Sequence, residues 1–378
     1  MAGLNHPDKR DWRYDVGAKT SFTSLCHGTN SSVSKSAAKP PSPRASRASG
    51  RVTIVDVARQ VGVSSMTVSR ALKTPQLVQQ EVRERIALAI TQLGYVPNRA
   101  ASTLASAHSQ LIGVLVPSLT NTVFIETLSG IRDCLGQAGY QFFIGETGYS
   151  PEQERELIAT YLTHAPDGFL LSSGDQHASV RQRLDSLHIP AVRMFDLGIS
   201  PPDMSVGFSQ IEAGYAVARH LIERGYRRPG FIAAQLDPRV MKRREGFRQG
   251  LAEAGINTDV EMLLPLPTTV AMGAQLLSQI LALAPDCDAI FCCNDDLALG
   301  ALFECQRRGI EVPQQMAIAG FNDLSWAACA TPSITTVITP RYEIGYQAAR
   351  MLLQCINGEA IAKPRIDLGF TLAVREST

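Results

Sequence analysis

The sequence predicts an α/β protein with an N-terminal all-α helix-turn-helix domain followed by two doubly wound α/β subdomains. Two short helical patterns separated by Gly62-Val63 predict the first part, because glycine permits a tight turn between helices. From Leu111 onward, short apolar runs alternate with amphipathic stretches of about ten or more residues, which is typical of a parallel sheet. The alternation starts again after Asp196, so we expect two similar α/β halves.

Charge is distributed unevenly along the 378 residues, although the formal net charge is only +1. Residues 1–50 carry a net charge of +5 and residues 51–109 a net charge of +4, which leaves −8 for the remainder. A basic front on an acidic body suits a polyanion that binds the N-terminal end. Residues 1–50 are rich in Ser, Pro, Ala and Arg and are expected to be a disordered basic tail. The alternative for this segment is a basic low-complexity tail that binds no target, because its charge would be the same.

Cysteine, histidine and hydropathy patterns exclude several classes of protein. The eight cysteines form no C-x-x-C pair and mostly lie in apolar runs, so we expect free thiols in a reducing compartment. The seven histidines show no metal-ligand spacing. No apolar run approaches the roughly 18 residues of a membrane helix, and the polar N-terminus is unlike a signal peptide. We therefore expect a cytoplasmic protein with no membrane partner, no metal and no cofactor.

Residues 51–96 are predicted to form a DNA-binding domain. Thr53 can cap the first helix, with Asp56 three positions later in a box-like arrangement. Gly62 permits a left-handed turn, and Ser64 can cap the second helix. In a helix-turn-helix, the second helix enters the major groove of DNA.

The second helix is expected to bury Val68 and Leu72 and to expose small polar residues with an arginine. Arg70 can make a bidentate contact to guanine, while Thr67 and Ser69 suit phosphate oxygens. An ordinary surface helix with one arginine has the same pattern. The DNA-binding candidates of this domain are Thr53, Ser64, Ser65, Met66, Thr67, Ser69 and Arg70.

The remaining elements are predicted in order along the chain. After a third helix at 79–93, we expect strands at 111–116, 141–145, 168–172 and 190–195, with helices near 123–138, 151–164 and 177–187. The second half is expected to have strands at 230–234, 260–264, 289–293 and 316–320, with helices near 209–225, 239–254, 270–283 and 295–308. A final helix at 341–356 and a strand at 366–372 follow. Ligands of such folds bind at the carboxyl ends of the strands, in the crevice between the halves.

Side chains that follow the strands of the first half are candidate ligand contacts. They are Ser118, Asn121 and Phe124 after the first strand, Glu146, Thr147 and Tyr149 after the second, and Ser172 at the end of the third. The first two have helix capping as a simpler role. In the second half, Asp295 and Asp296 are adjacent, but successive positions at a helix start point in different directions, so we expect no metal site there.

A basic run marks the predicted helix start near residue 239. Its positive residues are Arg239, Lys242, Arg243 and Arg244. A guanidinium pairs bidentately with a carboxylate or with vicinal hydroxyls. A neutral sugar needs one arginine and not a cluster, so the run favours an acidic effector. A solvated basic helix start is the alternative.

Two motifs resemble those of the LacI/GalR repressor family. D-V-A-x-x-x-G-V-S-x-x-T-V-S-R, at 56–70, is similar to its helix-turn-helix signature, and L-G-Y-x-P-N-x-x-A-x-x-L, at 93–104, to its hinge helix, which forms on DNA. The resemblance extends from about Val52 to the C-terminus and implies a hinge helix and linker at 97–109. Leu104 would be the apolar wedge in the minor groove, or else a linker leucine packed on the core. The implied DNA contacts of the hinge are Asn98, Arg99, Ala101 and Leu104.

The resemblance also implies the arrangement of residues 110–378. The family has two α/β subdomains like those of periplasmic sugar-binding proteins, joined by three crossovers, and it forms homodimers on palindromic operator DNA. On that pattern the N-subdomain comprises 110–208 and 341–365, and the C-subdomain comprises 209–338 and 366–378. The chain ends soon after the last strand, which favours a dimer over a tetramer.

Effector contacts follow from the same resemblance. Arg243 matches the position of the family's main effector-binding arginine, and Asn294 matches a ligand contact whose neighbour Asp295 caps the next helix. Asn322 stands where sugar-binding members usually have aspartate, and an amide there avoids repelling a carboxylate. The effector-binding candidates are completed by Thr268 and Arg341.

Longer stretches resemble the gluconate-operon repressor branch of this family. They are PSLTNTVF, FCCNDDLALGALFECQRRG, MAIAGFND and DLGFTL, and they imply gluconate, 6-phosphogluconate or a ketogluconate as effector. The leading interpretation is a sequence-specific repressor that a small sugar acid releases from its operator. A periplasmic-type solute-binding protein, a cytosolic sugar-binding protein without DNA activity and an enzyme are the alternatives. The G-x-G-x-x-G and Walker motifs are missing, so we expect no enzymatic activity.

Overall fold

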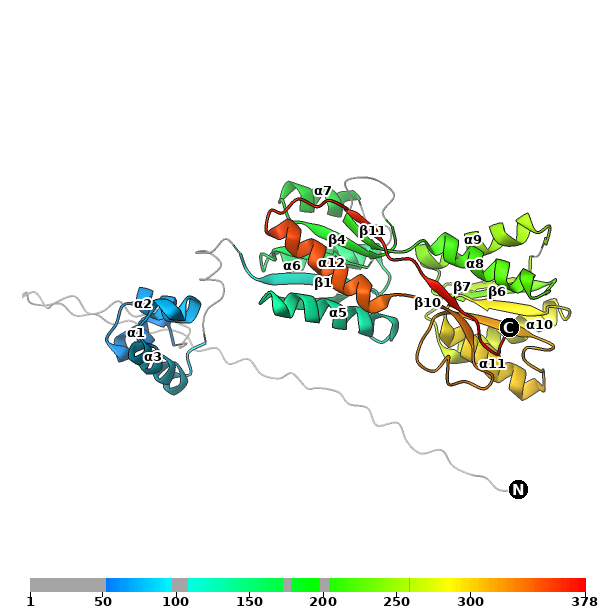
Figure 1. Ribbon diagram of the computed structural model, residues 1–378, viewed down its shortest axis with the longest axis horizontal. Helices are drawn as coiled ribbons and strands as arrows, with labels where there is room; N and C mark the ends of the chain where they lie inside the picture. The colour runs from blue at the N-terminus through cyan, green and yellow to red at the C-terminus, as the bar shows by residue number, and fades with distance from the viewer. Residues whose placement is uncertain (1–51, 97–107, 173–177, 198–203, 258) are drawn as a thin grey trace, which may run out of the picture. The chain divides into compact units, whose positions relative to one another are not determined.

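The computed structural model describes residues 52–96, 108–172, 178–197, 204–257 and 259–378. These residues form two compact units, 52–96 and 108–378, and each is described by itself (Figure 1). The predicted basic tail lies outside the described residues. So do the four hinge residues predicted to contact DNA, namely Asn98, Arg99, Ala101 and Leu104.

The first unit is a small helical domain with its own core. Its helices are α1 (Ile54–Val61), α2 (Ser65–Lys73) and α3 (Gln80–Leu93), with a short 3-10 turn, η1 (Pro75–Leu77). Gly62 ends α1 in the left-handed region, with φ of 76°, which a glycine adopts without strain. The buried core residues are Val57, Ala58, Val61, Val68, Ile86, Ala89 and Tyr95.

One predicted core residue of this unit is exposed. Leu72 was expected to face inward with Val68, but 42% of Leu72 is accessible to solvent. Ala71 packs against the core instead. The reason is geometric: Ala71 follows Val68 by three residues and turns toward the core, whereas Leu72, one residue further round the helix, lies at the edge of that face.

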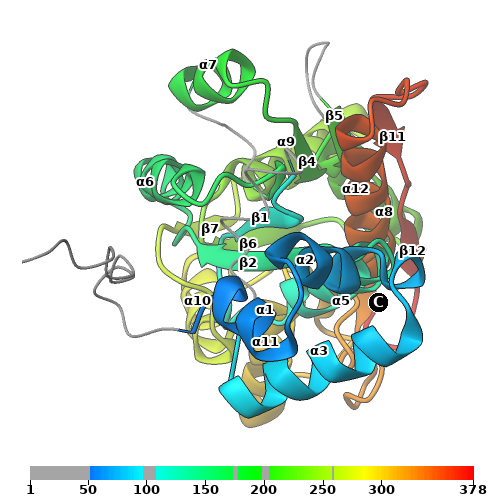
Figure 2. The same cartoon turned by 90° about the vertical axis from the view of Figure 1, so that its left-hand side faces the viewer.

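The second unit begins with a six-stranded parallel sheet in the order β11-β5-β4-β3-β1-β2. Helices α5 (Val123–Gln137) and α12 (Arg341–Ile356) cover one face, and α6 (Pro151–Leu162) and α7 (Ala178–Ser186) lie on the other (Figures 1 and 2). The strands are β1 (Leu111–Val116), β2 (Gln141–Glu146), β3 (Gly168–Leu171), β4 (Ala191–Phe195), β5 (Met204–Gly207) and β11 (Arg365–Asp367).

A second six-stranded sheet has the order β12-β10-β9-β8-β6-β7, and only the β10–β12 pair is antiparallel. Helices α8 (Gln210–Glu223) and α9 (Pro238–Glu253) lie on one side, and α10 (Val270–Leu283) and α11 (Asp295–Arg308) on the other (Figure 1). The strands are β6 (Pro229–Ala234), β7 (Glu261–Leu264), β8 (Ala289–Cys292), β9 (Ala317–Asn322), β10 (Thr335–Ile338) and β12 (Thr371–Ala373).

The chain passes between the two sheets three times, at β5 to α8, at β10 to α12 and at β11 to β12. The single strand predicted at 366–372 is therefore two strands, one in each sheet. Strands β5 and β10 were not predicted. They are four residues long and contain small or polar side chains, so no apolar run marks them.

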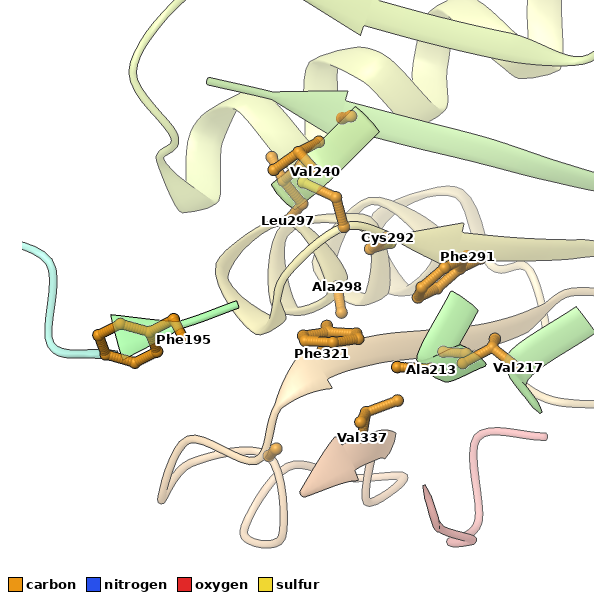
Figure 3. Close-up of a cluster of buried hydrophobic side chains, with 14 of the residues drawn as sticks. Phe195, Ala213, Val217, Val240, Phe291, Cys292, Leu297, Ala298, Phe321 and Val337 are labelled. Carbon is orange, nitrogen blue, oxygen red and sulfur yellow. The ribbon is translucent and has the colours of Figure 1, made fainter. Parts of the chain in front are cut away.

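Aromatic and aliphatic side chains of the second sheet form a buried cluster with α8, α9 and α11. Phe291 of β8, Phe321 of β9 and Val337 of β10 are fully buried in it, together with Ala213, Val217 and Leu297 of the helices (Figure 3). Burial of an aromatic side chain contributes strongly to stability, so this cluster holds the strand ends of the sheet in place.

Cysteines and membrane character were also predicted. The described cysteines are all free, and Cys134, Cys287, Cys292, Cys293 and Cys305 are buried, whereas Cys329 is exposed. Among the described residues, no helix is both long and apolar enough to cross a membrane. The described residues also contain no cluster of His, Cys, Asp or Glu that would hold a metal ion.

Helices α8 and α9 pack closely because glycines face the partner's backbone. A Cβ added at Gly246 would overlap the carbonyl oxygen of Ile211, and a Cβ at Gly214 would overlap the carbonyl oxygen of Arg243. We expect Gly246→Ala to lower the free energy of unfolding by about 1–3 kcal/mol, because the helices must separate. Urea denaturation measures this change.

The matched control is Gly136→Ala in α5, where an added Cβ meets nothing within 4 Å. At that exposed helical position alanine is expected to be neutral or to stabilise by up to about 1 kcal/mol. Equal effects of the two substitutions would contradict the packing account.

Candidate functional site

The exposed face of α2 carries the residues predicted to contact DNA. Ser65, Met66 and Arg70 are exposed, and no hydrogen bond or ion pair to a described residue holds the Arg70 guanidinium. Thr67 and Ser69 are half-buried. A free guanidinium on the second helix of a helix-turn-helix can reach a guanine edge in the major groove.

Two predicted DNA contacts are already engaged within the domain. Thr53 donates its backbone N–H and its hydroxyl to the Asp56 carboxylate, at 2.9 and 2.7 Å. Ser64 caps α2 by accepting the backbone N–H of Thr67 at 3.1 Å. Both residues therefore first position the recognition helix, and their contact with DNA stays a prediction.

A pocket of the second unit lies at the carboxyl ends of strands from both sheets, as expected for this architecture. Seven predicted effector contacts line it: Asn121, Phe124, Tyr149, Arg243, Thr268, Asn294 and Asn322. The other side chains that line it belong to Val123, Phe195, Phe208, Gln210, Ala234, Gln235, Asp237, Arg239, Val240, Asp296 and Thr339.

Arg243, on α9, is 8% exposed and rigidly held. Its Nε donates to Oε1 of Gln210 at 2.7 Å, its Nη1 donates to the carbonyl of Cys293 at 2.8 Å, and its guanidinium carbon lies 3.8 Å from the centre of the Phe321 ring. Burial lowers the pKa of Arg243 to about 10, so it remains charged at neutral pH. No carboxylate among the described residues is hydrogen-bonded to it, which leaves Nη2 for a ligand.

The other cations of the basic run have local carboxylate partners. Arg239 donates to Asp237 through Nη2 at 3.2 Å, and Arg244 donates to Glu261 at 2.6 Å, outside the pocket. Lys242 pairs with Asp196, and this ion pair connects α9 to the end of β4. The prediction that the whole run forms a basic cluster in the pocket is wrong. Helical periodicity separates the four side chains, and only Arg239 and Arg243 line the pocket.

Amide and hydroxyl groups form the polar walls of the pocket. The Asn121 side chain donates to the Tyr149 hydroxyl at 3.3 Å. Asn294 donates to the Thr268 hydroxyl at 3.2 Å and caps α11 through its side-chain oxygen. These groups offer both donors and acceptors to a hydroxylated ligand.

The expectation that Asp295 caps α11 is wrong. Asn294 caps this helix by accepting the backbone N–H of Leu297. The Asp295 carboxylate is fully buried and accepts the Thr336 hydroxyl at 2.6 Å and the Leu324 backbone N–H at 2.7 Å. Burial raises the pKa of Asp295 to about 6. Its hydrogen bond to Leu324 fixes the loop that follows Asn322, the last residue of β9.

Four predicted effector contacts of the first half do not line the pocket. The Ser118 hydroxyl accepts the backbone N–H groups of Thr120 and Asn121 and so stabilises its own turn. Glu146 accepts the N–H of Leu119 at 3.2 Å. The last two, Thr147 and Ser172, are buried.

Arg341 also lies outside the pocket lining. It is buried and donates to the carbonyl of Asn322 through Nη1 and to Glu126 through Nη2, the latter at 2.9 Å. Glu126 belongs to α5 and Asn322 to β9, so this arginine connects the two lobes of the second unit, one built on each sheet, beside a crossover.

Gln210, Asp237, Arg239 and Asp296 line the pocket but were not proposed as effector contacts. Gln210 follows the unpredicted strand β5, so no strand-end signal pointed to it. Asp237 and Asp296 lie at helix starts, where capping is the ordinary role of an acidic residue.

The chain combines a helix-turn-helix unit with a two-lobed α/β unit. This combination is typical of helix-turn-helix transcriptional regulators. The chain is 46% identical over 333 residues to the HTH-type transcriptional regulator GntR of Pseudomonas aeruginosa, covering 88% of this chain and 97% of that protein. It is 39% identical over 323 residues to the HTH-type transcriptional regulator GntR of Escherichia coli, covering 85% and 97%.

Residues 53–98 match the lacI family of bacterial regulatory proteins, and residues 218–378 match a periplasmic binding protein-like domain. The chain therefore belongs to the LacI family and is a DNA-binding transcriptional regulator. The crystal structure of transcription regulator GntR from Chromobacterium violaceum is also similar. It is 51% identical, with a TM-score of 0.69, and the match covers 71% of this chain and 98% of that one.

Replacing Arg70 by alanine is expected to weaken specific DNA binding by about tenfold or more. The substitution removes the bidentate donor on α2, and one such contact contributes about 1–3 kcal/mol of discrimination. Fluorescence anisotropy with a labelled operator measures the affinity. Arg219→Ala on α8 removes the same charge from the surface of the other unit and is expected to leave DNA affinity unchanged. Equal losses in both variants would show that Arg70 acts only through net charge.

A conservative change of Arg243 is expected to weaken effector binding. Lysine cannot reach Gln210, Cys293 and a ligand at once, so Arg243→Lys is expected to reduce effector affinity by about tenfold or more. The neighbouring Arg244→Lys is the control, because Arg244 binds Glu261 outside the pocket. Isothermal titration calorimetry measures the effector affinity of both variants. Equal affinities would show that Arg243 does not contact the effector.

Proposed function

We propose that this regulator represses genes of sugar-acid metabolism and leaves a palindromic operator when a small sugar acid, gluconate, binds the pocket. The observation that carries the proposal is the Arg243 guanidinium, which is buried, charged and hydrogen-bonded only to neutral groups among the described residues. A buried, charged guanidinium without a hydrogen-bonded carboxylate favours an anionic ligand. The proposal rests on this single arginine and not on a basic cluster, which the pocket does not contain. No cofactor or enzymatic activity is part of the proposal, and the protein acts in the cytoplasm as a homodimer.

The identity of the residue at 322 supports an acidic ligand. Asn322 is 6% exposed at the end of β9 and lines the pocket. An amide can donate to a carboxylate, whereas an ionised aspartate at the same place would repel it. Gluconate, with one carboxylate and five hydroxyls, matches the combination of an arginine with amide and hydroxyl walls. The sequence resemblance to the gluconate-operon repressor branch agrees with this choice.

Effector binding is expected to act on the relative position of the two lobes. The pocket takes Asn121, Tyr149 and Phe195 from the first lobe and Arg243 and Asn294 from the second. A ligand that contacts both lobes shifts the equilibrium between lobe arrangements only by its difference in affinity for them. We propose that this shift reaches DNA through the segment 97–107, which precedes the first strand.

The operator test is a gel shift with the intergenic region beside the protein's own gene. The protein is expected to retard this fragment at about 100 mM salt, and millimolar gluconate is expected to lower the affinity by about 5- to 150-fold, the usual range of allosteric coupling. A scrambled fragment of the same length is the control. No retardation, or retardation that gluconate leaves unchanged, would contradict the proposed function.

A further inference from the structure

The pocket contains an acidic side chain that the proposed function does not yet use. Asp296 lies in the first turn of α11 and lines the same pocket as Arg243. It is half-buried, and no hydrogen bond or ion pair to a described residue engages its carboxylate. Neighbouring Asp295 turns into the protein interior, so only the second of the two carboxylates faces the ligand space.

The two aspartates of the pocket have different electrostatic surroundings. Burial alone would raise the pKa of Asp237, but Arg239 and Arg243 outweigh it and lower the pKa. Burial also raises the pKa of Asp296, and no cation offsets the effect. Among the described residues, Arg239 is hydrogen-bonded to Asp237 and Arg243 to Gln210 and Cys293, and neither is hydrogen-bonded to Asp296. The pocket therefore has a cationic part at Arg243 and an acidic part at Asp296, which do not pair with each other.

Each part suits a different end of a polyhydroxy acid. The guanidinium of Arg243 binds a carboxylate. A partly desolvated carboxylate such as Asp296 accepts hydrogen bonds from hydroxyl groups, and it is costly to leave unpaired. A second carboxylate placed near it would be repelled, because two like charges in a partly buried site interact strongly.

We propose that Asp296 is a specificity-determining residue, which accepts hydroxyls of the effector's chain and excludes six-carbon acids with a carboxylate at both ends. The effector then binds in one orientation, with its carboxylate at Arg243 and its hydroxymethyl end toward Asp296. This inference rests on the proposed function, because it assumes that a sugar acid occupies the pocket.

A matched pair of ligands tests the inference by calorimetry on the full chain. Gluconate and glucarate have the same six-carbon chain and differ only at C6, which is a hydroxymethyl group in one and a carboxylate in the other. The wild type is expected to prefer gluconate by about tenfold or more. Asp296→Asn keeps the shape and removes the charge, so it is expected to weaken gluconate binding and to reduce the preference to about threefold or less.

Asp259→Asn is the control, because Asp259 is an exposed acidic residue of the same lobe that does not line the pocket. It is expected to keep the wild-type preference. A merely structural role of Asp296 at the start of α11 would alter thermal stability but not the ratio of the two affinities. An unchanged ratio in Asp296→Asn, with gluconate still bound by the wild type, overturns this inference alone. A wild type that binds neither acid overturns the proposed function and this inference with it.

Discussion

The buried guanidinium of Arg243 is the group on which the pocket of the second unit depends. It keeps its charge at neutral pH, and its hydrogen-bond partners among the described residues, Gln210 and the Cys293 carbonyl, are both neutral. Phe321 covers one face of it. A buried charge with incomplete compensation is costly unless a partner arrives, so an anionic ligand of the kind we propose would stabilise the folded pocket. Ligand chemistry is thereby linked to a single side chain.

The scaffold explains why that side chain is where it is. Arg243 lies on α9, which approaches α8 closely because Gly214 and Gly246 present no side chain at the contact. Gln210 starts α8 directly after a crossover from the first lobe, and Lys242 pairs with Asp196 at the end of β4. The arginine, the glutamine that orients it and an ion pair between the lobes therefore lie at the same junction. In the proposed function, a ligand at Arg243 would therefore contact the junction between the lobes and not one lobe alone.

Sequence patterns predicted the buried strands well, because β1, β6, β8 and β9 are continuous apolar runs. Strands such as β5 and β10 were missed, since small and polar residues pair in the sheet without an apolar signature. Among the site residues too, a local sequence pattern revealed some and missed others. Strand ends pointed to Asn121 and Asn294, but the neutralisation of Arg244 by Glu261 depends on a contact between residues 17 positions apart that no local pattern reveals. Pairing of charges across the fold decides which members of a basic run remain available to a ligand.

The most direct measurement of the central claim is the crystal structure of the protein with gluconate. We expect the ligand carboxylate within hydrogen-bond distance of the Arg243 guanidinium, with the hydroxyl chain directed toward Asn294 and Asp296. A gluconate molecule bound with its carboxylate away from Arg243, or bound outside this pocket, would contradict it.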